Sequence, residues 1–328
     1  MKFAKIKNIK TKISRICLGT WGLGSSTKKT PSYGKISSKR AKEILINAYK
    51  KKINFFDTAG VYGGGKSEDL IGEVFSPVRT KVIIATKVGC YDFNKKLDFS
   101  LSTSKELINT SLKRLKTNYL DIVQLHSPSE HDIKNEKIYE TIDYLNYLKK
   151  KKIISCVGIS LSSPSHLNLI KQTDFDLVQV NFNLMDQRIF ELKQIKKFSK
   201  KIMVRTALNF GILTENFIKN KVKISTYDHR YKWSSEQLKL WKEHAYNYDE
   251  IMKKWNKKYN IQQNAIKFCL NFFNFINVGI MKNSELNDYI NPYIFKKSSS
   301  KEIKTLKNYY KSNTFFINNL KPKIKIKL

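Results

Sequence analysis

Short apolar runs recur along this chain and alternate with segments of helical periodicity. Several runs are nearly continuous in Val, Ile and Leu, which is typical of strands buried on both faces. We expect eight strands, at Arg15–Leu18, Asn54–Asp57, Lys81–Thr86, Leu120–Leu125, Ile154–Ile159, Asp176–Val180, Ile202–Arg205 and Ile276–Ile280. Strand followed by helix eight times predicts a (β/α)8 TIM barrel. An open doubly wound sheet shares the alternation, but eight units and the absence of Gly-x-Gly-x-x-Gly after the first run favour the barrel.

Three of the helical segments carry local start signals or a clear apolar stripe. A capping box is expected at Thr103–Glu106, ahead of an apolar series. Ser37 and Ser38 precede another amphipathic segment. A third segment places four apolar residues on one stripe, at Ile138, Ile142, Leu145 and Leu148.

Two segments lie outside the repeating unit. Residues Met1–Ile13 alternate apolar and basic residues, which predicts an N-terminal β-hairpin closing the barrel bottom. About 70 residues separate the seventh and eighth strands, so an inserted loop and helix are expected at about Thr214–Tyr259. The insertion contains Tyr227–Arg230 and a helix-like run at Ser234–Tyr259. We find neither a further repeat nor a low-complexity linker, and predict one domain spanning 1–328.

The charge of the chain does not change this interpretation. There are 62 Lys and Arg against 27 Asp and Glu, a formal net charge of +35. Such an excess suggests nucleic-acid binding, but the lysines are spread along the chain and do not interleave with aromatic residues. Four isolated cysteines suit a reducing cytoplasm, and no metal-ligand spacing, signal peptide or membrane span is evident. We therefore expect a cytoplasmic protein with no specific nucleic-acid or membrane partner.

Four residue types suited to carbonyl chemistry follow predicted strand ends, where a barrel places its active site. They are Asp57, Tyr62, Lys87 and His126. A tyrosine has an ordinary pKa near 10, and a neighbouring ammonium such as Lys87 would lower it. Asp57 would keep that lysine charged and oriented, while His126 could donate a hydrogen bond to a carbonyl or relay a proton. Each residue alone is unremarkable; their order and context make a joint catalytic role the better hypothesis.

The surrounding sequence blocks resemble the aldo-keto reductase family. They are Phe55–Gly63, Ala85–Gly89 and Val123–Pro128, and the likeness extends from Leu18–Gly22 to about Asn283. The resemblance implies that Asp57, Tyr62, Lys87 and His126 form the catalytic set, with Tyr62 as general acid. It also implies a TIM barrel enzyme that reduces an aldehyde, ketone or sugar with NADPH, NADH being possible.

The resemblance further implies a set of binding residues. Gly19 and Thr20 would lie beside the nicotinamide with Asp57, and Trp21 would face the substrate with Tyr62 and His126. The expected carboxamide contacts are Ser160 and Gln179, and Arg205 and Thr206 stand where many members have a stacking Tyr and a Ser. The loop over the pyrophosphate would include Leu208, Gly211 and Leu213. A 2′-phosphate would be bound by Lys282, Asn283 and Ser284.

This chain departs from the family pattern at four of these places. Leu161 stands where an Asn usually contacts the carboxamide, and Glu215 replaces a Gly near the phosphates, so we expect Glu215 to point outward. Leu286 and Tyr289 occupy positions that usually hold Arg and Asn. The choice between NADP and NAD is therefore implied by the family and not by these residues.

Three other functions stay open. The same site could run in the oxidative direction as a sugar or alcohol dehydrogenase. A cofactor-binding regulatory subunit resembling channel β-subunits would keep the barrel without needing turnover. Non-specific nucleic-acid binding through the basic surface is the third. The sequence leaves the substrate, the direction in the cell and the oligomeric state open.

Overall fold

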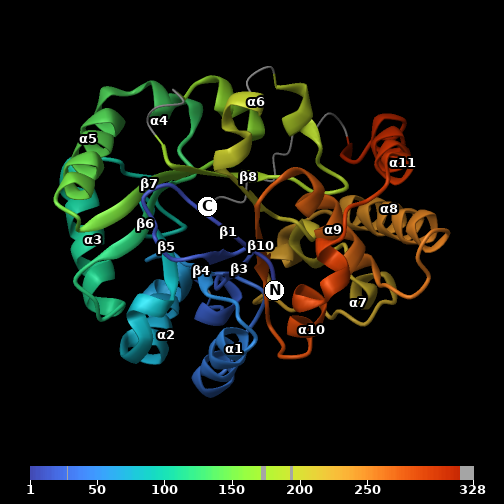
Figure 1. The fold of residues 1–328 in the computed structure, drawn as a ribbon, viewed down its shortest axis with the longest axis horizontal. Coiled ribbons are helices and arrows are strands. Elements are labelled where there is room, and N and C mark those ends of the chain that lie inside the picture. Colours follow the sequence, from blue (N-terminus) through green and yellow to red (C-terminus); the bar gives the residue numbers. More distant parts are fainter. Residues whose placement is uncertain (28, 171–174, 193–194, 318–328) are drawn as a thin grey trace.

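The computed structural model describes residues 1–27, 29–170, 175–192 and 195–317. Eight parallel strands close into a barrel in the order β10-β3-β4-β5-β6-β7-β8-β9 (Figure 1). They are β3 (Ile16–Gly19), β4 (Phe55–Asp57), β5 (Ile83–Val88), β6 (Leu120–His126), β7 (Ile154–Ser160), β8 (Leu177–Asn181), β9 (Ile202–Arg205) and β10 (Phe275–Gly279). The TIM barrel prediction is confirmed.

The strands lie within two residues of their predicted bounds, with one informative difference. The third strand begins at Ile83 and not at Lys81, because Ser76–Lys81 form a 3-10 helix with Pro77 in its first turn. That strand continues to Val88, so Lys87 lies inside it and not after it. β6 likewise continues to His126, which pairs with Ser160 at the end of β7. Parallel pairing therefore fixes the backbone of these two candidate residues.

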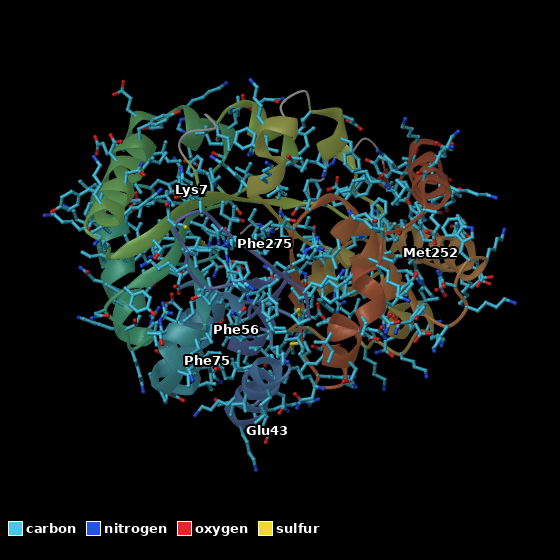
Figure 2. All side chains as sticks on the ribbon, viewed as in Figure 1. Lys7, Glu43, Phe56, Phe75, Met252 and Phe275 are labelled. Carbon is cyan, nitrogen blue, oxygen red and sulfur yellow. The ribbon has the colours of Figure 1, made fainter. Side chains whose placement is uncertain are left out.

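The N-terminal hairpin closes one end of the barrel, as predicted. Its strands, β1 (Phe3–Ala4) and β2 (Ile13–Ser14), pair antiparallel. Ile6, Ile9 and Ile13 are buried in a cluster with inward-facing strand residues such as Phe55 and Phe275. The rings of Phe55 and Phe275 meet edge to face at 5.7 Å, and Figure 2 labels Phe275 within the ring of strands. This apolar plug leaves the opposite, carboxyl end of the strands for the site.

Helices surround the strands (Figure 1). They are α1 (Ser38–Lys50), α2 (Lys66–Phe75), α3 (Leu101–Arg114), α4 (Glu130–Lys134), α5 (Glu136–Lys150), α6 (Ile195–Phe198), α7 (Glu215–Ile218), α8 (Ser235–Lys253), α9 (Ile261–Phe272), α10 (Glu285–Ile290) and α11 (Ser300–Lys311). Their apolar sides face the barrel: Phe56 of β4 packs on Phe75 of α2 with ring centres 4.5 Å apart (Figure 2). All four apolar residues of the stripe predicted in α5 are buried.

The helix starts were only partly predictable. Ser37 caps α1, since its side chain accepts a hydrogen bond from the Arg40 backbone N–H. The capping box expected at Thr103–Glu106 is wrong, because α3 begins at Leu101 with Ser100 as its cap. The Thr103 hydroxyl instead donates to the Asp98 carboxylate at 2.5 Å, and the helix begins two residues before Thr103.

The long connection between β9 and β10 contains the expected insertion. It folds as α7, a 3-10 helix at His229–Lys232, and α8. The helix predicted to run to Tyr259 ends at Lys253, and α9 begins anew at Ile261 with a capping box formed by Asn260 and Gln263. Among the described residues, no helix is long and apolar enough to cross a membrane.

Candidate functional site

The four candidate catalytic residues meet at the carboxyl end of the barrel, close to its axis. Lys87 Nζ donates to Asp57 Oδ2 at 2.7 Å, to the Thr58 carbonyl at 2.7 Å and to Tyr62 Oη at 3.3 Å. The side chains of Lys87 and Asp57 are 0% and 3% exposed. Tyr62 and His126 stand edge to face with ring centres 5.8 Å apart. A buried ammonium thus links a carboxylate to a phenol.

Tyr62 is held in place by the glycines that follow it. Residues Tyr62–Gly65 form a 3-10 helix in which Gly63 has φ 62°. A Cβ on Gly63 would lie 2.2 Å from the Gly24 carbonyl oxygen, so another side chain would push the two loops apart. The glycines therefore make this turn tight, and Tyr62 is 9% exposed.

Burial sets the protonation of the site. Lys87 lowers the pKa of Tyr62, as inferred from the sequence, but burial has the larger effect and raises the pKa above its ordinary value. Burial also disfavours the charge on Lys87, but Asp57 and Tyr62 together raise its pKa. Burial, Lys87 and Arg205 hold the pKa of His126 well below its ordinary value. At neutral pH the site therefore holds a phenol, an ammonium and a neutral imidazole.

A cavity of about 530 Å³ opens over Tyr62 and Asp57. Of the residues proposed from the sequence, those lining it are Gly19, Trp21, Asp57, Tyr62, Gln179, Arg205, Thr206, Leu208, Gly211, Lys282 and Ser284. Asn283 lines a second cavity of about 500 Å³, which shares Arg40, Lys282 and Ser284 with the first. Thr20, Lys87, His126, Ser160 and Leu213 line neither cavity. Most of the binding residues proposed from the sequence therefore line one cavity.

Several proposed cofactor residues are already engaged by the protein. Thr20 Oγ1 donates to the Asp57 carbonyl at 2.9 Å. Gln179 Nε2 donates to Asp57 Oδ1 at 3.1 Å, and its Oε1 accepts from Ser160 Oγ at 3.0 Å. Pairing of Gln179 with a carboxamide would require these bonds to be exchanged. Arg205 Nη1 donates to the hydroxyls of Ser127 and Ser160 at 3.3 and 3.2 Å, which orients its planar group.

The loop after β9 holds unusual backbone conformations at the cavity wall. Thr206, Asn209 and Phe210 have φ of 58°, 43° and 57°. Such conformations cost about 1–3 kcal/mol each in residues other than glycine. The Thr206 carbonyl accepts from Asn183 Nδ2 at 3.0 Å and from the Asn209 N–H at 2.7 Å. Fixed strain next to a cavity is typical of a functional loop.

The insertion is fastened across the cavity by a contact that the sequence did not predict. The His229 N–H and Nδ1–H donate to the Ser32 carbonyl at 2.8 and 3.0 Å. Arg230 binds both oxygens of Asp228 and donates to the Phe210 carbonyl at 3.0 Å. The only sequence signal was the polar cluster Tyr227–Arg230, whose partner lies about 200 residues earlier.

Cations gather at the outer end of the main cavity. Its lining includes Lys35, Arg40, Lys221, Lys223 and Lys282. Four carboxylates line the cavity as well, and each is engaged by the protein. Lys87 and Arg230 pair with Asp57 and Asp228. Backbone N–H groups bind Glu285 Oε2 at 2.8 and 3.1 Å, and amide side chains bind Asp288. The side-chain ammonium groups of Lys221, Lys223 and Lys282 form no hydrogen bond or ion pair within the described part of the chain. Glu215 pairs with Lys219 and lines neither cavity, in agreement with its expected outward position.

Comparisons with known proteins identify relatives of this chain. Residues 15–311 match the profile described as the Aldo/keto reductase family. The oxidoreductase YqkF of Bacillus subtilis is 27% identical over 325 residues, which cover 96% of this chain and 98% of that protein. An L-galactose dehydrogenase of Arabidopsis thaliana is 30% identical over 219 residues, covering 63% and 66%. The solved structure of a glycerol dehydrogenase from Gluconobacter oxydans superposes with a TM-score of 0.77 at 21% identity, covering 96% of each chain.

Proposed function

Because the chain belongs to the aldo/keto reductase family, we propose that it reduces the carbonyl of an aldehyde, ketone or sugar with NADPH, and that Tyr62 gives the proton. Family membership makes the protein an NAD(P)-dependent oxidoreductase acting on carbonyl or CH–OH groups. One observation supports the assignment of Tyr62 as the proton donor in carbonyl reduction. Lys87 Nζ bridges Asp57 Oδ2 and Tyr62 Oη at the base of the main cavity.

The main cavity fits a nicotinamide dinucleotide. Its inner end carries Arg205, whose fixed planar group can stack on a ring. Its outer end carries the unpaired cations Lys221, Lys223 and Lys282, which suit phosphates. The second cavity adds Lys39 to Arg40 and Lys282, which it shares with the first, and Glu43 is its one carboxylate. This second group of cations supports NADPH over NADH.

The residues of the site divide the work of carbonyl reduction. When bound, the reduced cofactor supplies a hydride for the carbonyl carbon. Tyr62 gives its phenolic proton to the carbonyl oxygen, which becomes the hydroxyl of the alcohol. Lys87, held charged by Asp57, stabilises the phenolate left on Tyr62. The neutral His126 donates an N–H to the same carbonyl oxygen and orients it.

Oxidation of an alcohol by the reverse route is the second candidate. The relative named L-galactose dehydrogenase supports it. In that direction the phenolate of Tyr62 accepts the hydroxyl proton. The assembled Asp57, Lys87 and Tyr62 cluster favours either enzymatic role over a regulatory subunit, because cofactor binding alone needs no proton donor.

A paired binding and turnover experiment tests this function. The purified protein is titrated with NADPH and NADH by quenching of tryptophan fluorescence, and NADPH consumption is then followed with a panel of aldehydes, ketones and sugars. We expect tighter NADPH binding and turnover of at least one carbonyl compound. NADPH binding without any turnover would favour the regulatory subunit, and binding of neither cofactor by folded protein would refute the proposal.

A further inference from the structure

The Asp57 carboxylate accepts hydrogen bonds from three side-chain amides besides Lys87. Gln124 Nε2 and Gln179 Nε2 each donate to Oδ1 at 3.1 Å. Asn277 Nδ2 donates to Oδ2 at 3.0 Å, the oxygen that also accepts from Lys87 Nζ. Four donors fill the acceptor sites of a carboxylate. Of these donors, Gln124 and Asn277 were not among the residues expected from the sequence.

Asn277 reaches Asp57 across an intervening strand. Asn277 lies on β10 and Asp57 on β4, and β3 runs between them. Gly19 at the end of β3 pairs with Asp57 on one side and with Gly279 on the other. A Cβ on Gly19 would lie 2.6 Å from Asn277 Oδ1. The Asn277 side chain therefore passes over the one position of β3 that lacks a side chain.

We propose that Asn277 is a positioning residue for proton transfer, and that residue 19 is glycine because the Asn277 side chain must cross it to hold Asp57. The orientation of the amide is fixed, since only its N–H group can face a carboxylate that accepts. The turnover part of this inference rests on the proposed function.

The contact has a direct consequence for the acid. Lys87, Asp57, Arg205 and His126 are the charged or titratable groups that face Tyr62. Asp57 raises the pKa of Tyr62, and the Asn277 N–H partly neutralises that carboxylate. Loss of the amide leaves more of the Asp57 charge to act on Tyr62 and Lys87. Alcohol oxidation, which needs the phenolate, should then require a higher pH.

Two single variants and their combination test the inference. Asn277→Ala removes the donor, and Gly19→Ala adds a methyl group that turns the amide away from Asp57. Each should lower kcat about tenfold, change KM for the carbonyl compound by less than about twofold, and move the alkaline rise of oxidation upward by about half a pH unit. The double variant should be no worse than Asn277→Ala, because the contact is already lost.

Gly60→Ala is the matched control. A methyl group there meets no atom closer than Glu68 Oε2 at 3.6 Å, and Gly60 lines neither cavity, so kcat and the pH profile should not change. The inference would be overturned if the losses of kcat in Gly19→Ala and Asn277→Ala multiplied in the double variant. An unshifted pH profile in both single variants would also overturn it.

Urea unfolding of the wild type, the two single variants and the double variant separates this inference from the proposed function. If the wild type turns over no carbonyl compound, the proposed function fails, yet the Gly19–Asn277 contact is still tested by unfolding. Non-additive losses of unfolding free energy would support the contact, and additive losses would contradict it.

Discussion

Replacing Asp57 by asparagine removes one charge from the centre of the site and changes almost no volume. Four donors converge on the two carboxylate oxygens in the native protein. An amide offers one oxygen in place of two, so two donors face an NH2 group whichever way it turns. The variant thus leaves buried donors without acceptors and Lys87 without its counter-charge.

The cost follows from the burial of the pair. Lys87 and Asp57 are 0% and 3% exposed and 2.7 Å apart. Removing one partner of such a pair costs about 3–5 kcal/mol, because the other charge stays buried. Asp57 also raises the pKa of Lys87 against the effect of burial. In Asp57→Asn the ammonium should therefore lose its proton at lower pH, and any residual turnover should fall as the pH rises.

The assay is urea unfolding followed by circular dichroism, with turnover measured on the same samples. Glu130→Gln is the matched control, because it neutralises a carboxylate that pairs with Lys134 on the surface at 58% exposure. We expect no measurable change in that control. An Asp57→Asn protein with the unfolding free energy of the wild type would refute the view that this network stabilises the fold.

Three further predictions concern pH and the cofactor. Because the pKa of Tyr62 is raised, carbonyl reduction should be constant between about pH 6 and 9, whereas alcohol oxidation should rise over that range; oxidation independent of pH would contradict this. Lys282→Ala should weaken NADPH binding about tenfold and NADH binding by less than about twofold in fluorescence titrations, and equal losses would contradict a contact with the 2′-phosphate. Burial lowers the pKa of His229 to about 4, so the stability it contributes above about pH 6.5 is lost as the pH falls towards 4. Between about pH 7 and 5, the unfolding free energy of the wild type should fall by about 2 kcal/mol more than that of His229→Phe. An equal fall in both proteins would contradict this.

Local sequence signals were sufficient to predict the barrel and the convergence of Asp57, Tyr62, Lys87 and His126 at one rim. Buried parallel strands must be apolar on both faces, so β6 and β7 stand out as continuous runs. Tyr62 and Lys87 were identifiable because strand ends in a barrel meet at one rim. The polar residue Asn277, inside the apolar strand Phe275–Gly279, was a visible signal. The contact of Asn277 with Asp57 was not predictable, because it depends on closure of the barrel around β3.

Contacts between distant segments account for what the sequence did not predict. The Ser32–His229 contact depends on how the insertion lies over the barrel. The raised pKa of Tyr62 depends on the depth of its burial, which no spacing of residues reports. The start of α3 turned on whether the Thr103 hydroxyl caps the helix or binds Asp98.

Tyr62→Phe tests most directly whether Tyr62 gives the proton. Phenylalanine keeps the ring that packs against Trp21 and Phe93 and removes only the hydroxyl 3.3 Å from Lys87 Nζ. NADPH affinity and single-turnover reduction would be measured on wild type and variant with the same carbonyl compound. We expect unchanged NADPH affinity and a reduction rate lower by about 10²–10⁴-fold. Reduction at the wild-type rate by the variant would contradict it.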